Sequence, residues 1–165
     1  MDTGIQKPIF ITPMKNGSTD NLAVDGSVTN IIYKIAPSSN QIFRLSYWQM
    51  SIKDGKGFDI NNFGSNGILT NGIMPRIKAD GGTYDMLPAG IRTNSDLAMI
   101  AEDFNLYTFG TADDILVTRW NFNNFGQMVR LDGSQGDELQ LVVRDNLTNI
   151  SAIKVLVAGY IEKGY

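Results

Sequence analysis

The chain of 165 residues contains no cysteine and no histidine. Without cysteine it can form no disulfide, and it offers no thiol nucleophile or thiolate metal site. Without histidine it lacks Ser-His-Asp and Cys-His catalysis and every imidazole metal site. The glycines show no phosphate-loop or dinucleotide-binding spacing. We therefore expect that the protein is not an enzyme and that it binds no cofactor.

Charge and long hydrophobic runs are also scarce. Fourteen Lys and Arg against 17 Asp and Glu give a net charge of -3, and no stretch is strongly basic, which argues against a nucleic-acid partner. The longest apolar run near either end, Val155 to Ile161, is too short to span a bilayer. Residues 1–8 lack the basic and apolar regions of a secretion signal. We expect a protein made in the cytoplasm with no membrane partner.

Helix-forming residues are few, whereas turn-forming and β-branched residues are abundant. The chain has only three Glu and nine Ala, but it has 14 Asp, 15 Asn, 17 Gly and 18 Ile. Asn-Gly and Asp-Gly pairs, which favour tight turns, divide the chain into pieces of about ten residues. This composition predicts an all-β fold, and we expect a two-sheet antiparallel jelly-roll β-sandwich of about eight to ten strands, in a single domain over residues 1–165.

Alternating apolar residues between these turns predict the individual strands. Residues 8–12 are bracketed by prolines and predict an edge strand or arm, and residues 1–20 are expected to form an extended N-terminal arm. The other predicted strands cover residues 30–36, 41–53, two short pieces within 68–79 broken by Gly72 and Pro75, 104–109, 114–122, 127–131, 137–144 and 151–161.

Three features of this pattern carry further expectations. The apolar phase flips between Tyr47 and Trp48, which predicts a β-bulge or a strand that crosses between sheets. The last two strands alternate clearly, and the short linker 145–150 predicts that they form an antiparallel hairpin. Residues 95–103 have apolar positions at helical spacing behind a Ser cap, but a strand is equally compatible with them. One short helix is therefore an open alternative there.

The acidic residues form two loops and two adjacent pairs. The loop 131–138 holds three carboxylates, which fits either a calcium loop or a polar turn in which Asp137 caps backbone donors. The loop 54–59 resembles an EF-hand loop faintly, but Lys56 stands at a ligand position. In each of the pairs at 102–103 and 113–114, the two side chains point to opposite faces of a strand. Neither pair therefore forms a two-carboxylate catalytic site. We expect solvated turns and no metal site.

The aromatic residues around positions 47–48 and 119–125 are the most unusual feature. Trp48, Trp120, Phe122 and Phe125 could form a stacking platform for sugar rings, or they could pack in the core or a subunit interface. The exposure of the rings distinguishes these alternatives, because a sugar platform needs two or three solvent-facing rings in one plane.

The C-terminal third contains three motifs in succession. They are a D-G-x-x-G-D turn at 132–137, an L-x-L-V-V-R-D strand at 139–145, and an ending of the form x-V-x-x-x-G-Y at 154–160. Over roughly residues 104 to 161 this pattern of strands and turns resembles the closing strands of small jelly-roll proteins from tailed-bacteriophage virions. These motifs are structural, so no site residues are carried over from that family.

The resemblance implies a capsid decoration or cement protein that binds the major capsid protein or other virion proteins and strengthens the head shell. It would act in the virion as a homo-oligomer, a dimer or trimer. The apolar segment Pro8, Ile9, Phe10 and Ile11 is the candidate interface, because it could pair with a neighbouring sheet edge. The alternative is a carbohydrate-binding module or a receptor-binding tail component on the same sandwich, and a calcium-dependent variant is a third.

Overall fold

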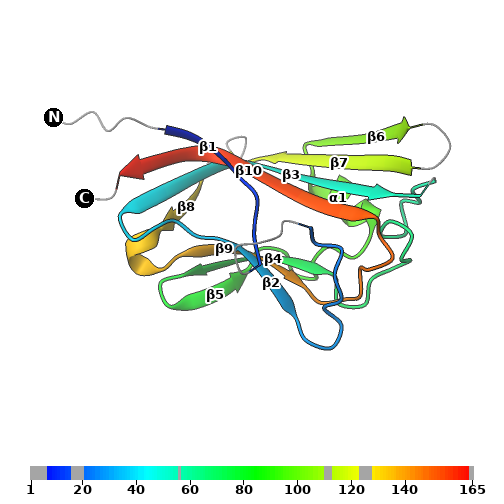
Figure 1. The fold of residues 1–165 in the computed structure, drawn as a ribbon, viewed down its shortest axis with the longest axis horizontal. Coiled ribbons are helices and arrows are strands. Elements are labelled where there is room, and N and C mark those ends of the chain that lie inside the picture. Colours follow the sequence, from blue (N-terminus) through cyan, green and yellow to red (C-terminus); the bar gives the residue numbers. More distant parts are fainter. Residues whose placement is uncertain (1–6, 16–20, 56, 110–112, 123–127, 164–165) are drawn as a thin grey trace.

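Two antiparallel sheets pack face to face in the structure, which is a computed structural model and describes residues 7–15, 21–55, 57–109, 113–122 and 128–163. Figure 1 shows the two layers. The six-stranded sheet has the order β1-β10-β3-β7-β6, with β8 also paired to β3, and the four-stranded sheet has the order β2-β9-β4-β5. The all-β sandwich is therefore confirmed, whereas the jelly-roll topology stays a prediction.

The element bounds agree with most of the predicted strands. They are β1 Lys7–Ile11, β2 Ile31–Ile35, β3 Gln41–Asp54, β4 Ile73–Ala79, β5 Gly82–Asp85, α1 Asn94–Ile100, β6 Asp103–Phe109, β7 Asp113–Asn121, β8 Val129–Asp132, the short 3-10 helix η2 Gly133–Gln135, β9 Glu138–Val143 and β10 Ala152–Lys163. The short helix is confirmed, and Thr93 caps it rather than Ser95. No helix in the described part of the chain is long and apolar enough to cross a membrane.

The long strand β3 organises the six-stranded sheet. Its first half pairs with β8, its second half pairs with β7, and β10 runs along its other side. Leu45 and Tyr47 face consecutive residues of β10, so Ser46 is an extra residue that forms a bulge. The buried side chains are odd-numbered before this bulge and even-numbered after it. The predicted phase flip is therefore a bulge, and the alternative of a strand that crosses between sheets is wrong.

The last two strands do not form the predicted hairpin. β9 pairs with β2 and β4 in the smaller sheet, whereas β10 pairs with β1 and β3 in the larger one. Each strand presents one apolar row to the same core, and their linker crosses from one sheet to the other. The alternation in both strands is real, but it reports a buried face and not the neighbour with which each strand pairs.

Strand β4 differs from the two predicted pieces because Pro75 lies inside it. Pro75 faces Leu141 of β9, while β5 pairs only with the later residues of β4, starting at Arg76. The carbonyl of Pro75 accepts a hydrogen bond from the backbone of Met86, just after β5 ends. Proline is tolerated here because its missing N–H falls outside the β4–β5 ladder.

A single hydrophobic core lies between the sheets. The larger sheet contributes fully buried residues of its central strands, and the smaller sheet contributes the inward faces of β2, β4 and β9. Examples with at most 2% exposure are Tyr33, Leu45, Met50, Ile52, Ile73, Leu116, Leu139, Leu141, Ile153 and Val155. Because this core holds β3, β7 and β10 in place, the outer strands of the larger sheet have fixed positions at its two edges.

Candidate binding surfaces

Strand β1 is one outer edge of the larger sheet, as the flanking prolines predict. Ile9 and Ile11 are half-buried and pack against the core, whereas Pro8 and Phe10 face outward. The ring of Phe10 is 74% exposed. Among the described residues, β10 is the only strand that pairs with β1. The four candidate interface residues thus divide into two that anchor the strand and two that a partner could contact.

Strand β6 is the opposite outer edge, and it is the most exposed strand of the protein. Both of its alternating rows of side chains face solvent, and only Asn105 is half-buried. Four large hydrophobic side chains of this strand are between 39% and 60% exposed: Phe104, Leu106, Tyr107 and Phe109. Figure 1 shows β6 at the end of the molecule, beside β7 and away from β5. Hydrophobic residues exposed on both faces of one strand are expected of an interaction surface.

The other outer strands carry residues that discourage edge-to-edge pairing. Pro8 lies in β1, Lys34 in β2 and Asp85 in β5. The one charged residue of β6 is Asp103 at its first position, and Arg119 of β7 neutralises it through an ion pair of 2.6 Å. Natural edge strands are usually protected by charge, proline or a covering element. The central and final residues of β6 lack such protection within the described structure.

The two tryptophans meet inside the sandwich. Trp48 in β3 faces Trp120 in β7 in the strand register, and their ring centroids are 5.1 Å apart with the planes tilted by 55°. The side chains are only 4% and 7% exposed, so they do not form an open aromatic plane. Phe122 lines a pocket that the two tryptophans also line, whereas Phe125 lies outside the described residues.

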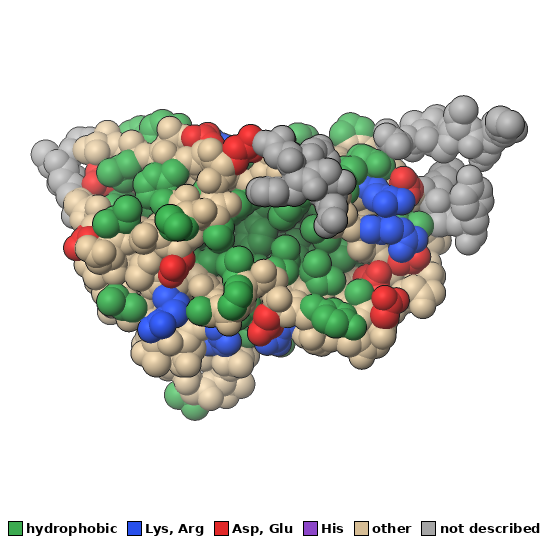
Figure 2. All heavy atoms as spheres, turned by 180° about the vertical axis from the view of Figure 1, so that it is seen from behind, with side chains coloured by type: hydrophobic (Ala, Val, Ile, Leu, Met, Phe, Trp, Pro, Cys, Tyr) green, Lys and Arg blue, Asp and Glu red, His purple; other side chains and the backbone are tan. Residues whose placement is uncertain are grey.

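A pocket of about 260 Å³ lies beside the tryptophan pair. Only hydrophobic side chains line it among the described residues: Trp48, Pro75, Met86, Leu87, Ile91, Ile100, Trp120 and Phe122. Figure 2 shows a face of the molecule on which hydrophobic side chains surround a central hollow. The pocket follows from the sheet topology, because β7 ends at Asn121 and β8 begins at Val129, so β3 changes partner here. Sequence periodicity cannot locate it, since its wall comes from both sheets and α1.

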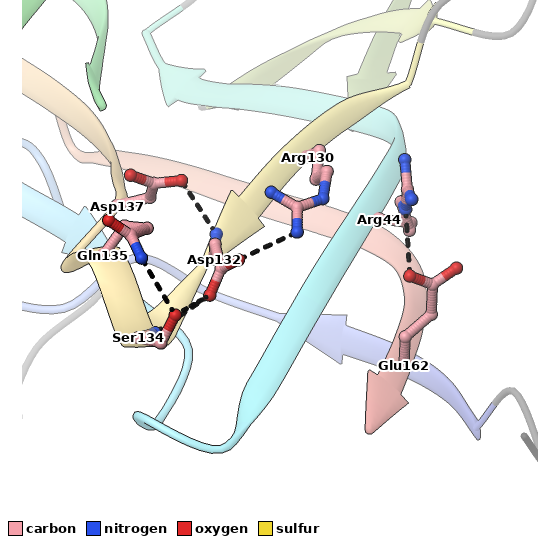
Figure 3. Close-up of polar contacts among 7 residues, drawn as sticks. All are labelled: Arg44, Arg130, Asp132, Ser134, Gln135, Asp137 and Glu162. Carbon is pink, nitrogen blue, oxygen red and sulfur yellow. Dashed lines mark hydrogen bonds and ion pairs between the residues drawn. The ribbon is translucent and has the colours of Figure 1, made fainter. Parts of the chain in front are cut away.

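The acidic loop at 131–138 is a polar turn (Figure 3). One carboxylate oxygen of Asp132 accepts hydrogen bonds from the backbone and the hydroxyl of Ser134, and Arg130 forms an ion pair with the other oxygen at 2.8 Å. The bond from the Ser134 hydroxyl, followed by that from Arg130, lowers the pKa of Asp132 below 3.8. Asp137 accepts from the backbone of Asp132 at 2.9 Å. The carboxylates therefore hold the turn itself.

The buried carboxylates at the other loop are also structural. Asp54 and Asp114 face each other at the ends of β3 and β7, with 5% and 4% exposure. Asp54 accepts from the backbone N–H groups of Gly55 and Ser65, and Asp114 accepts from that of Gly57. Asp113, the acidic neighbour of Asp114, points the other way, as expected for adjacent strand positions, and it forms an ion pair with Lys53 at 3.0 Å. No group of three or more metal-ligating side chains is found among the residues that the structure describes.

A comparison of the chain with family models and with curated proteins finds no match.

Proposed function

We propose that this protein is a structural component of a bacteriophage virion, a capsid decoration protein that attaches through its edge strands. The observation that carries the proposal is β6, a sheet edge with four exposed hydrophobic side chains and no guarding charge after its first residue. A strand added along such an edge gains backbone hydrogen bonds, while the exposed side chains provide apolar contact area.

The arrangement of strands supports the same proposal. The chain crosses repeatedly between the sheets, with β1, β3, β6 to β8 and β10 in one and β2, β4, β5 and β9 in the other. The orders β1-β10-β3-β7 and β2-β9-β4-β5 are compatible with the proposed jelly roll, an architecture found in viral capsid domains. The resemblance of residues 104–161 to virion proteins covers β6 through most of β10, so it includes the exposed edge.

Attachment in many copies would make individually modest contacts effective. One edge strand provides less contact than a stable standard-size interface needs, so β1 and β6 are expected to act together on different neighbours. Contacts of one oligomer, a dimer or trimer, at several points of a shell raise the total affinity by orders of magnitude. The burial of Trp48 and Trp120 favours this structural role over the carbohydrate-binding alternative.

The test compares two lysine substitutions at exposed edge positions. Leu106→Lys places a charge in the middle of β6, and Tyr84→Lys places one at a similarly exposed site in β5, where the side chains are 48% and 58% exposed. Each variant replaces the wild-type protein in a culture that produces the virus particles. The fraction of the variant that is recovered with DNA-filled particles is then measured by density-gradient sedimentation.

We expect the wild-type protein and Tyr84→Lys to sediment with the particles, and Leu106→Lys to remain largely in the unbound fraction while its circular dichroism is unchanged. Recovery of the wild-type protein only in the unbound fraction would refute the virion assignment. Equal particle recovery of Leu106→Lys and Tyr84→Lys would refute the role of β6.

A further inference from the structure

We propose that the pocket beside Trp48 and Trp120 is a binding site for a small, neutral, hydrophobic molecule, of the class of a medium-chain aliphatic alcohol. Nothing in the attachment role of β1 and β6 needs this pocket. The inference therefore stands or falls separately from the proposed function.

The walls of the pocket are fixed by the fold. The two tryptophans are held by the β3–β7 ladder, and Pro75 is held by β9. Ile91 exchanges two backbone hydrogen bonds with Ile73 of β4, at 2.8 and 2.9 Å. Ile100 is the last residue of α1, whose first turn is closed by a capping box. Walls on strands and a capped helix resist collapse, so the space is preorganised for a ligand.

Size and lining define the class of ligand. Dry apolar cavities of about 150 Å³ already accept molecules as large as benzene. The pocket here, at about 260 Å³, has room for a somewhat larger molecule of one or two rings or a chain of about eight carbons. No charged or amide side chain lies in its described wall, so neither a carboxylate nor a sugar would find partners there.

The polar groups of the two tryptophans add no exposed donor to the wall. The indole N–H groups of Trp48 and Trp120 are both shielded from solvent, and neither has a hydrogen-bond partner. Tryptophan N–H groups usually find a partner when they are buried. Because these N–H groups are shielded, the surface that a ligand meets is apolar, which favours a neutral ligand over a charged one.

The protein carries its own reporter for this site, because these are the only two tryptophans in the chain. Tryptophan emission is recorded while 1-octanol, octanoate or methyl α-glucoside is added to the full-length protein. We expect a saturable change with 1-octanol, a change at least about tenfold weaker in affinity with octanoate, and none with the glucoside, since burying an uncompensated charge or hydroxyls is costly.

A pair of matched substitutions locates the binding. Ile100→Phe fills the pocket, whereas Ile68→Phe makes the same change at a site that is 62% exposed and lies outside the pocket. We expect Ile100→Phe to weaken 1-octanol binding about tenfold or more and Ile68→Phe to leave it unchanged. Thermal unfolding confirms that both variants fold, and 1-octanol should raise the Tm of Ile68→Phe but not that of Ile100→Phe.

Three results would overturn the proposal. They are a lack of any saturable response to 1-octanol, equal affinity for 1-octanol and octanoate, and equal binding by the two variants. An emission change that depends on protein concentration alone, without a response to 1-octanol, would also refute it and would assign the pocket to a side chain of a second copy.

Discussion

Asp145 holds the turn before β4 against the end of β9, and its replacement should cost more stability than that of any exposed carboxylate. The residue is 9% exposed and is separated from the end of β9, Val143, by Arg144. Its carboxylate accepts hydrogen bonds from three consecutive backbone N–H groups, those of Thr70, Asn71 and Gly72, in the turn that leads into β4. Asp145 is also the last residue of the L-x-L-V-V-R-D motif, so these hydrogen bonds give the aspartate of that motif a structural role.

The magnitude follows from the hydrogen bonds that each substitution removes. Bonds to a charged acceptor are worth roughly 1.5–3 kcal/mol each, and bonds that share one acceptor are not additive. Asp145→Ala leaves three N–H groups without an acceptor and should cost about 3–5 kcal/mol. Asp145→Asn keeps one acceptor oxygen and should cost about 2–3 kcal/mol. For a chain of this size, 3 kcal/mol lowers the Tm by roughly 6–12 °C.

The assay is urea and thermal unfolding followed by circular dichroism at neutral pH. Asp85→Asn is the control, because Asp85 is exposed and forms a surface ion pair with Arg76 at 2.6 Å. Such a pair contributes about 0–1 kcal/mol. If Asp145→Ala lost less than about 1 kcal/mol, or no more than the control, the carboxylate would not be what holds this turn to β9.

Three further substitutions test other parts of the fold. Gly159→Ala should destabilise the protein by about 2 kcal/mol or more, because its Cβ would lie 2.0 Å from the carbonyl oxygen of Arg44, whereas Gly55→Ala meets nothing within 4 Å and should cost under about 1 kcal/mol; both are measured by urea unfolding. Thr93→Ala removes the cap of α1 and should cost about 1 kcal/mol in the same assay, with Thr93→Ser close to wild type. Burial raises the pKa of Glu138. Hydrogen bonds from Gln140 and Lys34, together with the charges of Lys34 and Lys78, lower the pKa by more and hold it below 4.5. The folded state therefore loses stability as the pH falls below about 4.5, and the Tm of Glu138→Gln should fall less steeply than that of wild type between about pH 5 and pH 3; parallel curves would contradict this.

The sequence predicts the fold class and most strands because turn residues and alternation are local signals. The bulge in β3 is visible in the same way, as a change of phase between Tyr47 and Trp48. The short strand β5 escapes prediction, since its four residues are mostly exposed and show no alternation. The hairpin expected for β9 and β10 is wrong because pairing depends on which sheet buries each apolar row, a property of the whole chain.

The candidate surfaces also differ in how far local sequence signals predict them. The prolines around β1 mark an edge strand, so the exposure of Phe10 is within reach of sequence analysis. The strand β6 is predicted, but its sequence, which places hydrophobic residues on both faces, does not reveal that both faces lack cover. The meeting of Trp48 with Trp120 requires the register of β3 and β7, which long-range pairing sets. The pocket beside them combines both sheets and α1, and no local pattern reports it.

Hydrogen–deuterium exchange of β6 tests the central claim most directly. In the isolated protein, the outward-facing backbone N–H groups of Asp103–Phe109 should exchange rapidly, because only β7 pairs with this strand in the described structure. In assembled particles, the same peptide should become strongly protected, while peptides from β5 exchange as before. If β6 exchanged equally fast in both states, the exposed edge would not be the attachment surface, and the proposed role in assembly would be contradicted.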